Sequence, residues 1–230
     1  MYAVVNLCTS NLNDLGDLTS ALKIEYCQRH GYEFHNIGDE FIGERTEPWT
    51  FAMDWYKPKF VLKLFNERPD IEWALVTEAD ATITNLTIPI ENKIDNDYHV
   101  IAPVDRLNIN SGNLLLRNSA EGRAYLQAML DDESKYLVNT TNNPIFGLQL
   151  WIVDTIEQHA DIVKIVPQKH MNSYEHGIYD YCDIRTDIMG NYGAWEPGDW
   201  IIHWPGIRNE VRIQRASTLE QEERITRWYK

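Results

Sequence analysis

Short apolar runs alternate with longer amphipathic stretches along most of this chain, and the alternation limits the fold more than any other feature. Short runs rich in β-branched side chains predict buried strands, and stretches with apolar residues three and four apart predict helices. The expected strands cover residues 2–8, 32–37, 72–77, 99–104, 113–117, 162–166 and 201–202. The expected helices cover residues 15–30, 51–68, 119–131 and 145–159, and a capping box at 217–220 predicts a last helix.

Strands that alternate with helices indicate an α/β fold. The 230 residues suit one large domain, and 43% of them are apolar, which is enough for a continuous core. No internal repeat or linker divides the chain. Residues 38–49 and 168–199 are rich in glycine and polar side chains, so we expect loops there, the second folded over a site.

The formal net charge of −14 disfavours nucleic acid as a partner, because an acidic surface repels the phosphate backbone. It does not exclude nucleic acid, since residues 208–230 are locally basic. No apolar stretch approaches the roughly 20 residues of a membrane span, and the first residues do not resemble a signal peptide. Cys8, Cys27 and Cys182 lack metal-ligand spacing. These features predict a cytoplasmic protein with reduced thiols and no membrane partner.

An acidic pair, Glu78 and Asp80, directly follows the apolar run at 72–77. Ligands of open α/β sheets gather at the carboxyl ends of the strands, and two carboxylates one residue apart can face one hard cation. The alternative is an ordinary polar turn after a strand.

A second segment of interest is His-Trp-Pro-Gly-Ile-Arg at 203–208. His203 follows a short strand and precedes a Pro-Gly turn, so it is a candidate metal ligand, and Arg208 could clamp a phosphate. The alternatives are a hydrogen-bonded structural histidine and a solvated arginine. A third segment, 108–112, offers Asn110 and Gly112 to a sugar, although a plain turn fits equally well.

Five segments carry more information together, in this order, than any of them does alone. They are Trp-Tyr-Lys-Pro-Lys at 55–59, Glu-Trp-Ala-Leu-Val-Thr-Glu-Ala-Asp-Ala at 72–81, Leu-Asn-Ile-Asn-Ser-Gly-Asn-Leu-Leu-Leu-Arg-Asn-Ser at 107–119, Val-Pro-Gln-Lys-His-Met-Asn-Ser-Tyr at 166–174 and Gly-Asp-Trp-Ile-Ile-His-Trp-Pro-Gly at 198–206. The set resembles the galactosyl, mannosyl and xylosyl transferase family of fungi and plants. Without that family's usual membrane anchor and stem, the chain resembles a short, soluble microbial or viral member.

The resemblance implies a retaining glycosyltransferase with a single Rossmann-like GT-A domain, in which helices flank a mixed central sheet. Residues 1–105 would form the nucleotide-binding half, 106–208 the donor-sugar and acceptor half, and 209–230 a helical tail. It implies an Mn²⁺ or Mg²⁺ ion held by Glu78, Asp80 and His203, which bridges the diphosphate of a nucleotide sugar, most simply a UDP-sugar.

The resemblance also implies individual roles in this site. The substrate-binding set that we expect is Thr9, Lys59 (or Lys57, one alignment step away), Glu78, Asn110, Gly112, Gly206 and Arg208. Gln149 matches a glutamine near the anomeric carbon. The family usually has an acid just before it, where this chain has Leu148, so Asp105 is the candidate substitute.

Two other readings stay open. A nucleotidyltransferase acting on sugar phosphates would share the acidic metal site, but no glycine-rich phosphate loop follows the first strand. A non-catalytic carbohydrate-binding relative would also fit, since Glu78 and Leu148 depart from the family pattern. The acceptor is a glycan or another hydroxyl compound, a modified DNA base included. Trp195, Trp200 and Trp204 are candidates to stack on it.

Overall fold

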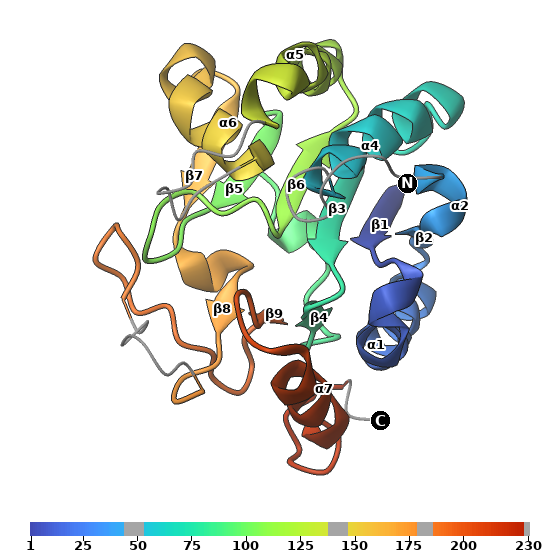
Figure 1. Ribbon diagram of the computed structural model, residues 1–230, viewed down its shortest axis with the longest axis vertical. Coiled ribbons are helices and arrows are strands. Elements are labelled where there is room, and N and C mark those ends of the chain that lie inside the picture. The colour runs from blue at the N-terminus through green and yellow to red at the C-terminus, as the bar shows by residue number, and fades with distance from the viewer. Residues whose placement is uncertain (44–52, 138–146, 179–185, 228–230) are drawn as a thin grey trace.

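The computed structural model describes residues 1–43, 53–137, 147–178 and 186–227, in which strands and helices alternate as predicted (Figure 1). The strands are β1 (Tyr2–Leu7), β2 (Glu33–Ile37), β3 (Trp73–Glu78), β4 (Ala81–Ile83), β5 (Val100–Pro103), β6 (Leu114–Arg117), β7 (Val163–Val166), β8 (Ser173–Tyr174) and β9 (Ile201–His203). The helices are α1 (Asn13–His30), α2 (Asp39–Ile42), α4 (Tyr56–Glu67), α5 (Ala120–Tyr136), α6 (Gly147–Thr155) and α7 (Asn209–Thr218). Short 3₁₀ turns lie at Ser10–Leu12, Met53–Trp55, Ile90–Asn92, Ile156–His159 and Gln168–His170.

The central sheet has six strands in the order β2-β1-β3-β6-β5-β7. β1 runs parallel to β2 and β3, whereas β6 runs antiparallel to both of its neighbours, β3 and β5. The sheet is therefore mixed, and the expected α/β class with a mixed central sheet is confirmed. Because β6 is antiparallel, its first residues lie at the same edge as the last residues of β1 and β3.

Alternate residues of the strands face two different cores. Val5 and Val76 pack on one face against α4, α5 and α6, where Phe65, Tyr125 and Trp151 are fully buried. On the other face, the neighbouring strand residues pack against α1 and a second, smaller sheet. Near-continuous apolar runs in the sequence reflect this burial on both faces.

The smaller sheet has the order β4-β9-β8, and it lies at the lower end of Figure 1 beside α7. β4 follows β3 after a turn of two residues, so the small sheet begins where the central strand ends. β4 and β9 pair antiparallel with Ala81 opposite His203, and the Trp204 N–H donates to the Asp80 carbonyl at 2.9 Å. This register places segments distant in sequence beside each other.

Three expectations for local structure need correction. Part of the loop expected at 38–49 is the short helix α2, and residues 44–49 lie outside the described part of the chain. Pro58 does not break the helix expected at 51–68, because it falls in the first turn of α4, where its missing N–H costs nothing. The capping box at 217–220 opens no helix: Ser217 and Thr218 belong to the last turn of α7 and donate to carbonyls three residues earlier.

The other boundaries agree with the predicted elements within a few residues, and residues 51–52 and 145–146 of two expected helices lie outside the described ranges.

No helix in the described ranges combines the length and the apolar character that crossing a membrane requires. Cys8 and Cys27 are buried free thiols, and Cys182 is outside those ranges.

The segment expected as a long loop, 168–199, is largely irregular where it is described, although it contributes β8. A buried carboxylate, Glu175, fastens it to α7 and to the segment after β9. Glu175 accepts from Trp204 Nε1 at 2.7 Å, pairs with Arg224 at 3.0 Å and contacts Arg215. Although burial favours the neutral acid, the two arginines hold the pKa of Glu175 below its usual value.

Replacing Glu175 by alanine should lower the free energy of unfolding by about 3 kcal/mol or more, because it leaves two partly buried arginines without their counter-ion. Glu222→Ala is the matched control: Glu222 faces the same arginines at 3.4 and 3.6 Å, but its side chain is 40% exposed, so its loss should cost less than about 1 kcal/mol. Urea denaturation of both variants measures the difference. Equal losses would contradict the anchoring role of Glu175.

Candidate active site

A cavity of about 310 Å³ lies where the carboxyl ends of β1 and β3 meet the segment that leads into β6. Several of the residues singled out in the sequence line it: Thr9, Glu78, Asp80, Asn110, Gly112, Gln149, His203 and Gly206. Asp105, Lys59 and Arg208 are not part of the lining. The structure thus brings most of the candidate set to one place.

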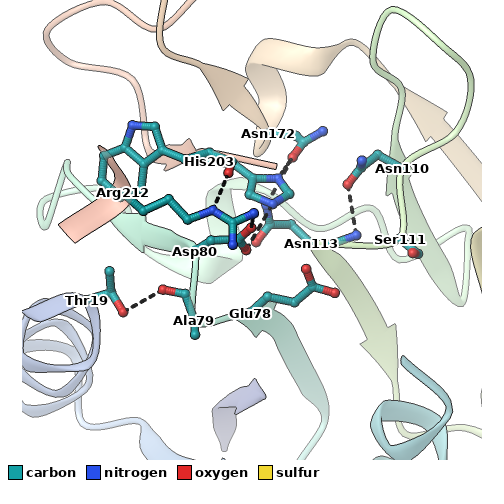
Figure 2. A network of polar contacts seen from close by, with 12 residues as sticks. Thr19, Glu78, Ala79, Asp80, Asn110, Ser111, Asn113, Asn172, His203 and Arg212 are labelled. Atoms are coloured by element: carbon teal, nitrogen blue, oxygen red, sulfur yellow. Dashed lines mark hydrogen bonds and ion pairs between the residues drawn. The ribbon is translucent and has the colours of Figure 1, made fainter. Parts of the chain in front are cut away.

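Glu78, Asp80 and His203 each direct one potential ligand atom into a cluster whose atoms lie within 4.8 Å of one another. Glu78 ends β3, Asp80 lies in the turn between β3 and β4, and His203 ends β9. The β4–β9 pairing positions the imidazole over the acidic turn, as Figure 2 shows. Thr19 of α1 holds that turn from below, since its hydroxyl donates to the Ala79 carbonyl at 2.9 Å.

The neighbours of His203 define its tautomer. Asn172 Oδ1 lies 2.7 Å from His203 Nδ1 and also accepts from Asn113 Nδ2 at 3.1 Å. Because an amide oxygen only accepts, Nδ1 carries the proton and Nε2 presents its lone pair. Nε2 is buried, has no hydrogen-bond partner within the described ranges, and faces Asp80 Oδ1 at 3.3 Å. A lone pair facing carboxylate oxygens is a donor set that fits a divalent cation.

The Asp80 carboxylate lies between two different groups (Figure 2). Its Oδ1 faces His203, and its Oδ2 pairs with Arg212 Nη2 at 2.7 Å. Burial works against the charged form, but the Arg212 guanidinium outweighs it and holds the pKa of Asp80 well below its usual range. Asp80 is therefore ionised at neutral pH.

Glu78 is held by a buried lysine from the start of α4. Lys57 Nζ contacts Glu78 Oε1, donates to the Ser111 carbonyl at 2.9 Å and lies 3.5 Å from Asp54 Oδ1. Burial alone would lower the pKa of Lys57, but the two carboxylates raise it above its usual value. Burial raises the pKa of Asp54 to about 6, and Glu78 adds to this against the opposing effect of Lys57.

A second buried lysine lies behind the acidic turn. Lys23 of α1 is fully buried, and its Nζ donates to Asn6 Oδ1 at 2.6 Å and to the Glu78 carbonyl at 2.8 Å. Burial lowers its pKa to about 7. Lys23 thus fixes the backbone at the end of β3 from inside the protein.

The loop before β6 is fixed by its own hydrogen bonds. Asn110 Nδ2 donates to Asp105 Oδ2 at 3.0 Å and to the Tyr174 hydroxyl at 3.1 Å, and Asn110 Oδ1 accepts from the Gly112 N–H at 2.8 Å. Asp105 also accepts from Tyr174 and from the backbone N–H groups of Leu107 and Asn108. Asp105 is therefore buried and occupied by donors, and it shapes the loop from behind.

Gly112 is required where it is because of His203. A Cβ at Gly112 would lie 2.5 Å from His203 Cε1 and 2.9 Å from Asn110 Oδ1, far inside contact distance. The missing side chain lets the loop pass against the imidazole and so fixes one wall of the cavity.

Two expected cationic residues lie elsewhere. Lys59 points to α5, where it pairs with Glu133 at 2.7 Å, whereas Lys57, two residues earlier, reaches the site. Arg208 is exposed at the residue preceding α7. Two of the tryptophans that we expected to stack on an acceptor, Trp200 and Trp204, are fully buried in the core. The expectation is therefore wrong for these two residues.

Sequence reasoning missed several polar residues around the site, namely Lys23, Asp54, Asn172 and Arg212. Lys23 carried a signal, since a lysine within the apolar stripe of a helix is unusual and needs a buried partner. Arg212 carried another, one helical turn beyond Arg208. Asn172 stood in a quoted motif without a role, and we find no sequence signal for Asp54.

Lys57→Met should lower the free energy of unfolding by about 3 kcal/mol, because it leaves Glu78 and Asp54 side by side without their counter-ion. Lys59→Met is the matched control two residues away. Lys59 forms a partly exposed pair with Glu133, so its loss should cost less than about 1 kcal/mol. Thermal and urea denaturation give both values, and similar effects at the two positions would contradict the buried role of Lys57.

Parts of this chain are similar in sequence to known galactosyltransferases. Residues 9–96 match the model of the galactosyl transferase GMA12/MNN10 family. An alpha-1,2-galactosyltransferase of Schizosaccharomyces pombe is 21% identical over 217 residues, which cover 79% of this chain and 53% of that protein. A probable alpha-1,2-galactosyltransferase of the same yeast is 21% identical over 83% of this chain and 60% of its own length. The chain thus spans little more than half the length of these relatives.

Solved structures agree on the fold. A glycosyltransferase involved in glycosylation of the major capsid of PBCV-1 superposes with a TM-score of 0.72 at 14% identity, covering 94% of this chain and 98% of that one. The galactosyltransferase LgtC, solved with donor and acceptor sugar analogues, gives 0.54 at 12% identity over 99% and 98% of the two chains. These matches confirm the resemblance: the chain has the fold of GT-A glycosyltransferases, and its residues 9–96 are similar to the galactosyl transferase GMA12/MNN10 family.

Proposed function

We propose that this chain is a metal-dependent, retaining glycosyltransferase that moves a hexose or pentose from a nucleoside diphosphate sugar to a hydroxyl acceptor. One observation carries the proposal: Glu78, Asp80 and His203 converge within 4.8 Å in a cavity at the carboxyl end of β3. The relatives' names support sugar transfer, and they make UDP-galactose the first donor to test.

Glu78, Asp80 and His203 would hold the cation. Carboxylates suit Mg²⁺ and Mn²⁺ alike, but an imidazole is a poorer ligand for Mg²⁺, so we propose Mn²⁺. When bound, the ion supplies positive charge to the departing diphosphate, which removes the need for a strong protein acid.

The residues of the chain support same-face substitution over double displacement. Leu148 is fully buried in the core, so the position before Gln149 offers no carboxylate to the cavity. The Asp105 carboxylate is occupied by its hydrogen-bond donors and stands outside the lining. Neither residue is placed to act as a nucleophile, and we propose that the configuration at the anomeric carbon is retained without a glycosyl-enzyme intermediate.

Other residues would orient the substrates. We propose that Thr9, Gly206 and the side chain of Glu78 contact the nucleotide, that Asn110 and Gly112 shape the sugar pocket, and that Gln149 faces the anomeric carbon. In this arrangement residues 1–105 bind the nucleotide, 106–208 bind the donor sugar and acceptor, and the helical tail at 209–230 contributes Arg212 of α7 to the cavity lining. The acceptor is a hydroxyl of a glycan in the simplest case.

A donor screen with Mn²⁺ tests the proposal by release of a nucleoside diphosphate. Asp80→Ala and His203→Ala should each lower turnover by about 10²-fold or more, because each removes a group that holds charge at the leaving diphosphate. Lys63→Gln, which changes an exposed charge on α4, is the control and should keep full turnover. Circular dichroism confirms that each variant is folded.

Some outcomes would reject this function. Near-normal turnover in both variants would place the chemistry elsewhere, and release of pyrophosphate would indicate a nucleotidyltransferase. Sugar binding without any donor hydrolysis would indicate a non-catalytic relative. Inverted anomeric configuration in the product, measured by NMR, would reject the retaining mechanism alone.

Asn172→Ala should weaken Mn²⁺ binding about 10- to 100-fold, because Asn172 holds the His203 ring in the tautomer that frees Nε2. Isothermal titration calorimetry measures the affinity. Asn191→Ala, an exposed change on the neighbouring loop, is the control and should not alter it. Unchanged Mn²⁺ affinity in Asn172→Ala would contradict the orienting role.

A further inference from the structure

We infer that Arg212 of α7 is the side chain that binds a phosphate oxygen of a nucleoside diphosphate in this cavity, in place of Arg208. The inference rests on the proposed function and adds to it a residue that the sequence pattern did not indicate. It comes from the position of the Arg212 guanidinium, which lines the cavity beside Asp80.

The guanidinium is fixed at two points and open at a third. Its Nε donates to the Trp204 carbonyl at 2.9 Å, and its Nη2 pairs with Asp80 Oδ2 at 2.7 Å (Figure 2). Nη1 has no partner within the described ranges. A planar guanidinium held at one edge presents its remaining N–H groups in a fixed direction, the arrangement that suits phosphate oxygens.

The other cationic side chains near the cavity already have protein partners or lie outside the lining. Lys57 is divided among Glu78, Asp54 and the Ser111 carbonyl, and Lys23 is fully buried behind the acidic turn. Arg208 is exposed and absent from the lining. Within the described ranges, Arg212 therefore combines a positive charge with unpaired donors at the cavity wall.

The charges of the site also favour an anionic ligand next to Arg212. Its carboxylates, Asp54, Glu78 and Asp80, lie beside the cationic side chains of Lys57 and Arg212, and Lys23, whose pKa is lowered to about 7, lies behind the turn. A divalent cation added to this set leaves an excess of positive charge, which a diphosphate would offset. Asp80 lies between the two positive partners, with Oδ1 toward the metal ligand His203 and Oδ2 toward Arg212. A diphosphate bound to a cation at this cluster would therefore lie close to the Arg212 guanidinium.

The same geometry predicts effects of opposite sign when the arginine is removed. Arg212 competes electrostatically with a cation for Asp80, so its loss should leave Mn²⁺ binding unchanged or tighter. Its loss should weaken binding of a diphosphate, because a charge-assisted hydrogen bond disappears. If Arg212 only held the site together, its removal would weaken binding of both Mn²⁺ and the diphosphate.

The experiment is calorimetric titration of the whole chain with Mn²⁺ alone, and with UDP in saturating Mn²⁺. Arg212→Gln should bind UDP about ten- to a hundredfold more weakly than the parent. It should bind Mn²⁺ at least as tightly, and bind uridine, which has no phosphate, equally well. Arg212→Lys should recover part of the UDP affinity. Lys63→Gln controls for the loss of one positive charge.

Several results would overturn the assignment. These are unchanged UDP affinity in Arg212→Gln, loss of Mn²⁺ and UDP binding together, equal weakening for uridine, or a loss in Arg208→Gln that Arg212→Gln does not share. In each case the parent still binds UDP, so the proposed function stands. Failure of the parent itself to bind UDP with Mn²⁺ would instead count against the proposed function.

Discussion

The antiparallel pairing of β4 with β9 is the contact on which the site depends. It sets His203 opposite Ala81 and bonds the Trp204 N–H to the Asp80 carbonyl, so the backbone of His203 cannot move relative to the acidic turn without breaking the ladder. A shift of one residue in this register would turn His203 to the opposite face of the small sheet. Backbone hydrogen bonds therefore set where His203 lies, and the hydrogen bond to Asn172 orients its ring.

Around this pairing the protein keeps several charges out of water in matched pairs. Lys57 and Arg212 each hold one carboxylate of the acidic turn, and Lys23 holds its backbone. Such pairs contribute little net stability, because desolvation offsets most of their attraction. Their benefit lies in fixed geometry, since removing any one partner leaves a buried charge without compensation.

Much of this arrangement could be predicted from sequence, and the reasons for the rest are physical. The apolar run before Glu78 fixed β3, and with it the location of the acidic turn at a sheet edge. The sequence could not choose between Lys57 and Lys59, because that choice depends on where the first turn of α4 begins. Arg212 was missed for a similar reason: the capping box at 217–220 suggested a helix start where α7 in fact ends. Long-range registers and helix phases, which set side-chain direction, are decided by tertiary packing.

Glu78 and His203 belong to segments far apart in the chain, and no short fragment contains both. An unfolded chain therefore has no cluster to offer a cation, and any ion that binds there binds the folded state alone. Such a ligand adds its binding free energy to the stability of the fold. The melting temperature of this protein would then rise with the concentration of a divalent ion that binds this cluster.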